Sequence, residues 1–103
     1  MIKFASRGWE DYLYWQTAGR AILKRINALI RDIERSPFSG IGKPKPLKHQ
    51  LTGFWSRCID HCHRLVYCVE NESILIAQCR DHYFTIHILP VLNKPAFAFL
   101  SSA

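Results

Sequence analysis

The sequence lacks a long uninterrupted apolar run. Its first residues, "MIKFASRGWEDY", do not contain the apolar stretch of a signal peptide, and every segment of membrane-spanning length includes charged residues or proline. These absences predict a cytoplasmic protein without a membrane partner. Internal repeats and low-complexity tracts are also missing, and 103 residues give room for one domain with a modest core.

Acidic residues are scarce. Eight Asp and Glu stand against 14 Lys and Arg, which gives a formal net charge of +6. The surplus lies entirely in residues 1–52, which carry ten Lys and Arg against four Asp and Glu. A polyanion such as nucleic acid, an acidic protein or an anionic membrane surface is therefore the natural partner, although a solvated surface is the plainer interpretation.

Cysteines are few. A chain without an export signal meets a reducing compartment, so the four are expected to be free thiols, partly buried. The run "CIDHCHR" contains zinc-ligand residue types, but four of them within six residues cannot readily wrap one tetrahedral ion. We therefore expect no metal or other cofactor, and we rank a zinc site and a Cys/His nucleophile pair well behind other readings of Cys58, His61, Cys62 and His63.

Hydrophobic periodicity predicts an α+β domain with the element order β-α-α-β-β-β. A strand at 2–5 is followed by a helix that ends near Gly19 and by a second helix at about 20–35. Five apolar residues line one face of the second helix, namely Ile22, Ile26, Leu29, Ile30 and Ile33. Three aromatic and β-branched segments then predict an antiparallel meander at 54–60, 63–70 and 73–80.

Two basic features accompany these elements. The opposite face of the second predicted helix carries a row of cations, namely Arg20, Lys24, Arg31 and Arg35. The segment "PFSGIGKPKP" at 37–46 contains three prolines and two glycines, which excludes a regular element and predicts an exposed loop. That loop continues into "KPKPLKH" at 43–49, so its lysines are expected to face solvent beside the sheet.

A further set of residues fits ribonuclease chemistry. Cleavage of RNA by its own 2′-hydroxyl needs a proton acceptor, cations for the transition state and an acid for the leaving oxygen, but no metal. Arg57, Arg64 and Arg80 lie on the predicted strands, and His82 and Tyr83 follow the last one. Arginine suits phosphate and histidine suits proton transfer near neutral pH. A basic RNA-binding module would contain the same residues, and each of them has an ordinary structural reading.

The chain resembles the YoeB/Txe family of bacterial toxins from type II toxin–antitoxin systems. The resemblance is carried by "WEDYLYWQ", "PFSGIGKPKPLKHQLTGFWSR", "HRLVY" and "CRDHY", which occur in the family's order and cover nearly all of residues 1–83. It implies a RelE-like fold similar to microbial ribonucleases, with two N-terminal helices packed on a twisted antiparallel sheet. It also implies an mRNA endoribonuclease that acts in the ribosomal A site and is held inactive by a YefM/Phd-type antitoxin; a homodimer is compatible with it.

The same resemblance assigns roles to individual residues. It implies that Arg64 is the transition-state cation, that His82 is the general acid and that Tyr83 positions the substrate. Lys48 and Arg57 match basic positions that would hold RNA phosphate. Further contacts to rRNA and mRNA are expected from the loop and the helix row, through Lys43, His49, Arg20, Lys24, Arg31 and Arg35.

The chain departs from the family at the general base. Where the family usually has glutamate, this sequence has Lys45, and a protonated lysine cannot accept a proton. Lys45 could act as the base only if Lys43, Lys48 and Arg64 favoured its neutral form; otherwise His49 or another group must take over. Weaker or differently tuned cleavage is therefore expected, and a toxin-like module that binds antitoxin or ribosomal RNA without useful catalysis is the alternative.

Two further departures concern Cys58 and the C-terminus. Cys58 occupies a position where the family often has another arginine, which removes one phosphate ligand. Relatives end close to the His-Tyr pair, whereas this chain continues. We therefore divide it into a toxin domain at 1–83 and an extension at 84–103, which could cover the cleft, extend the sheet with a strand through about Leu89, or alter docking.

Overall fold

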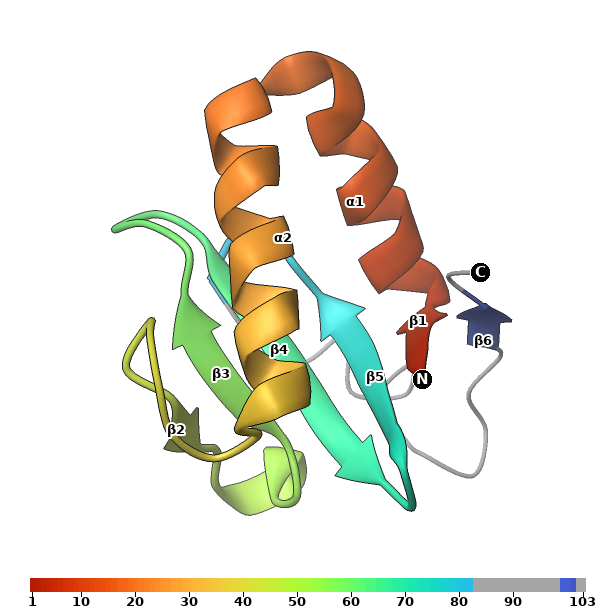
Figure 1. Cartoon of the computed structure of the whole chain (residues 1–103), viewed down its shortest axis with the longest axis vertical. Helices are drawn as coiled ribbons and strands as arrows, with labels where there is room; N and C mark the ends of the chain where they lie inside the picture. The colour runs from red at the N-terminus through yellow and green to blue at the C-terminus, as the bar shows by residue number, and fades with distance from the viewer. Residues whose placement is uncertain (83–98, 102–103) are drawn as a thin grey trace.

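The two helices lie together on one face of a six-stranded sheet (Figure 1). The structure is a computed structural model that describes residues 1–82 and 99–101. Helix α1 spans Ser6–Ala18 and helix α2 spans Arg20–Arg35, with Gly19 between them, as the sequence predicted. Neither of these helices has the length and hydrophobicity needed to cross a membrane. The expected α+β fold is confirmed.

The strands follow the predicted segments closely. The sheet has the order β2-β3-β4-β5-β1-β6, and β2 to β5 pair in series in antiparallel fashion. The strands are β1 (Ile2–Ala5), β2 (Lys45–Pro46), β3 (Trp55–Cys58), β4 (Arg64–Glu70), β5 (Ser73–Gln78) and β6 (Phe99–Ser101). A short 3-10 helix, His49–Leu51, follows β2. The expectation that the proline-rich loop contains no regular element was wrong, because Lys45–Pro46 pairs with β3 at the sheet edge.

The sheet is mixed, so the expectation of a wholly antiparallel sheet was also wrong. Strand β1 lies parallel to β5, with Ile2 opposite Ile74 and Phe4 opposite Ile76. Local patterns predict hairpin partners but give no direction for a strand that pairs across the chain. Strand β6 pairs antiparallel with β1, so part of the extension adds an edge strand to the sheet. The strand expected through about Leu89 lies outside the described residues.

The main core lies between the helices and the sheet. Ile26, Leu29 and Ile33 of α2 are fully buried against residues such as Leu65 and Tyr67 of β4. The predicted apolar face of α2 is thereby confirmed, with Ile22 and Ile30 packed at its margin. Burying a side chain of this kind contributes about 1.5–3 kcal/mol each.

Helix α1 approaches the sheet unusually closely. A Cβ at Gly8 would lie 2.3 Å from the carbonyl oxygen of Ile76, so only glycine fits there. Trp15, further along α1, is buried and donates its indole N–H to the carbonyl of Cys79 at 2.9 Å. These contacts fix α1 over the C-terminal end of β5.

A second apolar cluster covers the face of the sheet that the helices leave open. Segment 47–54 lies over it and contributes Leu47, Leu51 and Phe54. Because these side chains point inward, their neighbours Lys48 and His49 are exposed. The cluster is completed by Ala5, Val66, Cys68, Leu75 and Ala77.

Arg57 is the most unusual buried residue. Its side chain is fully buried, and its guanidinium donates to the Asp32 carboxylate of α2 at 2.6 Å. It also donates to the carbonyls of Ser36, Ser39 and Ile41, at 2.7, 2.9 and 3.0 Å. A buried charge is tolerated only when it is paired and hydrogen-bonded in this way. The interaction joins α2, the loop after it and β3.

Tyr67 completes the network around Arg57. Its buried hydroxyl accepts a hydrogen bond from Arg57 Nε at 3.2 Å and donates one to the carbonyl of Pro37 at 2.7 Å. Burial raises the pKa of Tyr67, so the hydroxyl keeps its proton and remains a donor.

We expect Tyr67→Phe to lower the free energy of unfolding by about 1–3 kcal/mol, because the guanidinium and the Pro37 carbonyl both lose a buried partner. Urea denaturation measures this change. Tyr14→Phe is the matched control, since Tyr14 is exposed and its substitution should alter stability by about 0.5 kcal/mol or less. Equal effects of the two substitutions would contradict the network.

The backbone N–H of Ile41 and then the Arg57 guanidinium hold the pKa of Asp32 below its ordinary value of 3.8. Such a carboxyl binds fewer protons in the folded state, so its contribution to stability is complete above pH 3.8 and is lost as the pH falls through the folded-state pKa. We expect the urea concentration at the unfolding midpoint to decrease as the pH is lowered through this acidic range. For Asp32→Asn the decrease should be less steep. Some slope should remain, because Asp60 also has a lowered pKa. An unchanged slope in the variant would contradict this assignment.

Candidate functional site

Arg64 is held in a fixed orientation at the start of β4. Its side chain is partly buried, and its Nε and Nη2 both donate to the Ser56 hydroxyl oxygen, at 3.2 and 3.0 Å. Two bonds to one acceptor define the plane of the guanidinium. No role was predicted for Ser56 from the sequence, but strand alternation with Arg57 is a signal that places Ser56 on the opposite face of β3.

Lys45 flanks the same serine on the other side. Lys45 of β2 is directly opposite Ser56 of β3 in the antiparallel register. Side chains at such positions share a face, with Cβ atoms about 4.5–5.5 Å apart. Because the neighbouring Arg57 points toward α2, this shared face is the one away from the helices. Lys45, Ser56 and Arg64 therefore come together on the face of the sheet that α1 and α2 do not cover.

His82 lies at the same end of the sheet as Arg64. The backbone N–H of Arg64 donates to the carbonyl of Asp81 at 3.0 Å, and His82 is the next residue. Gln78 fixes this segment as well, since its Nε2 donates to the carbonyls of Arg80, Asp81 and His82 at 2.9, 3.3 and 2.7 Å. The His82 side chain is exposed. Tyr83 lies outside the described residues.

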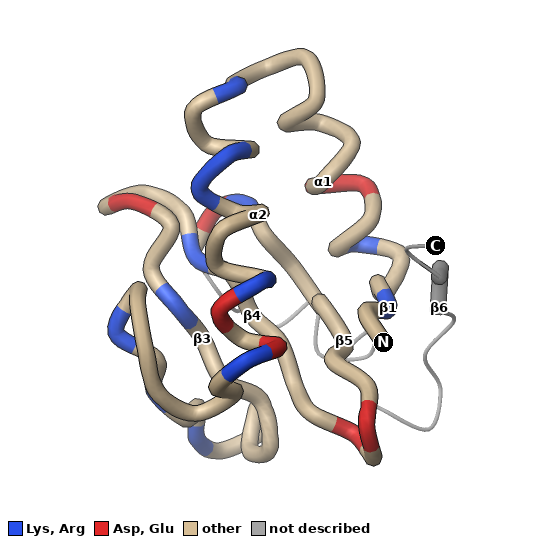
Figure 2. Tube along the Cα trace, viewed as in Figure 1, with Lys and Arg blue, Asp and Glu red and all other residues tan. Residues whose placement is uncertain are grey.

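The lysine-rich loop stands beside this site. Lys43, Lys48 and His49 are exposed, and Lys43 and His49 adopt positive φ angles of 52° and 58°. Strand β2 ties the loop to β3 at the sheet edge. Figure 2 shows basic residues around β2 and along α2, whereas acidic residues mark the connection between β4 and β5.

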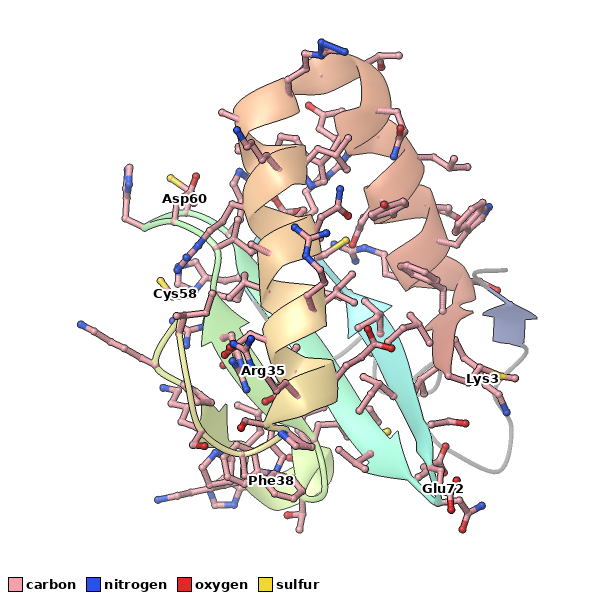
Figure 3. The ribbon with its side chains drawn as sticks, viewed as in Figure 1. Lys3, Arg35, Phe38, Cys58, Asp60 and Glu72 are labelled. Atoms are coloured by element: carbon pink, nitrogen blue, oxygen red, sulfur yellow. The ribbon has the colours of Figure 1, made fainter. Side chains whose placement is uncertain are left out.

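The basic row of α2 is exposed as predicted, but it does not join this site. Ile26 and Ile33 of α2 face the sheet, so Arg20, Lys24, Arg31 and Arg35 point outward from the helical layer. Arg35, labelled near the end of α2 in Figure 3, pairs with Asp32. The row and the Lys45–Arg64 face therefore belong to opposite sides of the molecule.

The expectation that Arg57 binds RNA phosphate is corrected by the structure. Its side chain has no exposed surface, and its guanidinium hydrogen-bonds to Asp32, Tyr67 and backbone carbonyls of the protein. Sequence reasoning failed here because a buried structural arginine and a phosphate-binding arginine look alike on a strand. The one available signal was Asp32, an acidic residue between Leu29 and Ile33 on the buried side of α2.

The connection between β3 and β4 places Cys58 beside Arg64. The two residues are directly opposite each other in the register, and the Cys58 thiol lies 3.2 Å from the carbonyl of Asp60 (Figure 3). Burial works against ionisation of Asp60, but the backbone N–H groups of Cys62 and His63 donate to Oδ1 and hold its pKa below the ordinary value. The carboxylate thereby shapes the turn that leads into Arg64.

The four cysteines are free, as predicted, and Cys68 and Cys79 are buried. Burial raises the pKa of the Cys79 thiol well above its usual range. Within residues 1–82 and 99–101, no three His, Cys, Asp or Glu side chains are grouped so that they could hold a metal ion.

Comparisons with known proteins point to one family of toxins. The family described as "YoeB-like toxin of bacterial type II toxin-antitoxin system" matches residues 4–83. Toxin YoeB of Escherichia coli (strain K12) is 58% identical over 80 residues, which cover 78% of this chain and 95% of that protein. Toxin YoeB of Streptomyces coelicolor is 55% identical over 82 residues, which cover 80% and 98%.

Solved structures are similar over the same region. A YoeB/ParE toxin from Agrobacterium tumefaciens matches with a TM-score of 0.78 and 42% identity, covering 80% of this chain and 98% of that one. A YoeB-YefM complex from Staphylococcus aureus gives a TM-score of 0.76 and 46% identity, with 81% and 97% covered. The YoeB dimer from Staphylococcus aureus gives 0.75 and 47%, with 80% and 95% covered.

Proposed function

Because the chain belongs to the YoeB-like family of toxins from bacterial type II toxin–antitoxin systems, we propose that it is an endoribonuclease that cleaves mRNA on the ribosome. The reaction is metal-independent attack of an RNA 2′-hydroxyl on the adjacent phosphate, which releases the 5′-oxygen of the next nucleotide. Cutting mRNA in the ribosomal A site stops translation, and the site of action is the cytoplasm.

The roles follow from what each side chain can supply. Arg64 stabilises the additional negative charge of the phosphorane-like transition state, since its planar guanidinium matches phosphate oxygens. His82 protonates the leaving oxygen, because an imidazolium loses its proton near neutral pH. Tyr83 follows His82 directly and positions the substrate.

One observation carries this proposal. The hydrogen bond from the Arg64 backbone to the Asp81 carbonyl sets the arginine and the segment containing His82 at the same end of the sheet. An arginine and a histidine on opposite faces, or at opposite ends of the sheet, could not act on a common phosphate. Lys45 also supports a phosphate site here. It lies opposite Ser56 on the β2 side, and Arg64 contacts the same serine from the β4 side.

Lys45 then acts mainly through its charge. A protonated lysine stabilises phosphate but cannot remove the 2′-hydroxyl proton. The base is a neutral fraction of Lys45, His49 or another group close to the scissile phosphate. Each of these bases is less effective than a carboxylate beside Arg64, so cleavage is slower than in a family member with glutamate at this position.

RNA is held on the two basic surfaces of the toxin. Lys43, Lys48 and His49 bind mRNA phosphates next to the site, because they are exposed on the loop that β2 ties to the sheet edge. The row on α2 faces away from the site and contacts rRNA instead. That row consists of Arg20, Lys24, Arg31 and Arg35.

A YefM/Phd-type antitoxin neutralises the toxin. The similar Staphylococcus aureus toxin is known in complex with YefM and as a dimer, which supports an antitoxin complex and a homodimer for this chain too. An acidic antitoxin segment would cover the same cations that bind RNA. We assign catalysis to residues 1–83, and we treat 84–103 as an extension that reinforces the sheet through β6.

A second function is favoured by Lys45 and Cys58. Lysine in place of the family's glutamate and cysteine in place of an arginine remove a base and a phosphate ligand from one face. A chain with both changes could retain the toxin shell and bind antitoxin or ribosomal RNA without useful cleavage. Mapping mRNA 5′ ends on stalled ribosomes by primer extension separates the two functions, because only the enzyme produces cuts in the A site.

We expect His82→Ala to reduce A-site cleavage by about 100- to 10,000-fold, the usual contribution of a general acid. Primer extension on programmed ribosomes measures the cut, and His61→Ala is the control, since His61 is an exposed residue on the β3–β4 connection. Cleavage by His82→Ala at the rate of the unchanged protein would remove His82 from the mechanism.

We expect Lys45→Glu to raise the cleavage rate by about tenfold or more, because the substitution supplies a carboxylate base beside Arg64. Lys43→Glu changes the net charge equally at a neighbouring exposed position, and we expect it to weaken RNA binding without any gain in rate. Single-turnover cleavage of mRNA on ribosomes compares the two. If Lys45→Glu gives no gain, another group already acts as the base.

A further inference from the structure

The backbone at Asp81, next to the proposed general acid, is held in an unusual conformation. Its φ angle is +67°, in the left-handed region, which aspartate adopts more readily than most residues other than glycine. Hydrogen bonds to the Asp81 backbone help to hold this conformation. It also determines the direction in which the chain presents His82.

Two consecutive residues at the beginning of β4 form hydrogen bonds with the Asp81 backbone. The Nδ1 atom of His63 accepts a hydrogen bond from the Asp81 N–H at 2.8 Å. The backbone N–H of Arg64 donates to the Asp81 carbonyl at 3.0 Å. The imidazole thus takes the place that a strand carbonyl would have in an ordinary β-ladder. Both the backbone N–H and the backbone carbonyl of Asp81 have a hydrogen-bond partner.

The His63 ring is itself fixed. It packs edge-to-face on Trp15, with the ring centroids 4.9 Å apart and an angle of 79° between the planes. The Trp15 indole is buried and donates to the carbonyl of Cys79 at the end of β5. Helix α1 therefore holds the ring that in turn holds Asp81. A rigid ring can define the position of its hydrogen-bond donor.

We propose that neutral His63 is a positioning residue for the reaction, and that it sets the general acid His82 against the phosphate bound by Arg64. This inference rests on the proposed function and adds a residue to it. His63 touches neither substrate nor leaving group. It acts through Asp81, whose two backbone groups fix the peptide that leads into His82.

The hydrogen bond from the Asp81 N–H to His63 requires one protonation form of the imidazole. An acceptor at Nδ1 means that the proton of the neutral ring is on Nε2, whereas an imidazolium carries protons on both nitrogens and cannot accept. Charged groups near this hydrogen bond are Asp60 on the β3–β4 connection, Asp81 and Arg80 after β5, and Arg7 on α1. Arg7 also donates to the Arg80 carbonyl at 3.3 Å, which supports the same segment from α1.

Amide side chains test this geometry directly. The oxygen of asparagine reaches approximately the position of the imidazole Nδ1, whereas the longer glutamine reaches approximately that of Nε2. We expect His63→Asn to keep kcat for ribosomal mRNA cleavage within about threefold. We expect His63→Gln and His63→Ala to lower kcat by about 10- to 100-fold with KM nearly unchanged, because a small misplacement of an acid slows the chemical step.

A second measurement separates failure of this inference from failure of the proposed function. Hydrogen exchange of the Asp81 amide, followed by NMR, should become about tenfold faster in His63→Ala and His63→Gln but not in His63→Asn. If the unchanged protein does not cleave mRNA, the proposed function is wrong, and the exchange rates still decide whether His63 holds Asp81.

Two results would overturn the inference. The first is equal kcat values for His63→Asn and His63→Gln, since a general loss of packing would affect both alike. The second is unchanged Asp81 exchange in His63→Ala. If His63→Ala does not fold, the comparison of the asparagine and glutamine variants, each checked by urea denaturation, decides the question alone.

Discussion

The ion pair between Arg57 and Asp32 is the interaction on which the rest of the structure depends. A guanidinium without solvent contact has to find all its partners inside the protein, and these partners belong to α2, to the loop after it and to Tyr67 of β4. Removing one partner leaves the other buried charge uncompensated. The stability lost in this way is much larger than any stability that the ion pair provides relative to apolar side chains at the same positions. The pair therefore specifies one arrangement of helix, loop and sheet. Because Lys45 follows this loop, the position of β2 at the sheet edge depends on it.

Strand alternation separates this structural chemistry from the candidate site. Arg57 points to the helical face of β3, and its neighbours Ser56 and Cys58 point to the other face. The buried arginine consequently stabilises the strand without contributing charge to the surface where Arg64 lies. The two arginines differ in a described partner: the Asp32 carboxylate pairs with Arg57, whereas the Ser56 hydroxyl orients the guanidinium of Arg64. Only the second arrangement suits a group that is to stabilise phosphate.

Local elements were predictable from the sequence because their signals are local. The apolar stripe of α2, Gly19 between the helices and the meander strands follow from periodicity and turn residues, and the structure agrees. Non-local facts were not predictable in this way. Nothing in residues 2–5 indicates that β1 runs parallel to β5, and nothing in strand β3 distinguishes Arg57 from a phosphate ligand. The hydrogen bonds of Ser56 and His63 were missed for the same reason, since each involves a partner that lies 8 or 18 positions away in the chain.

Lysine at position 45 changes what the site does in the absence of substrate. A glutamate there would lie beside Arg64 with opposite charge and could pair with it. Lys45 and Arg64 have like charges on either side of Ser56, and like charges in such proximity favour an anion between them. These charges support the proposed binding of phosphate, or of an acidic segment of an antitoxin, at this face. They do not supply a group that removes the 2′-hydroxyl proton, so on the proposed function lysine at residue 45 affects the binding of RNA and the rate of its cleavage in different ways.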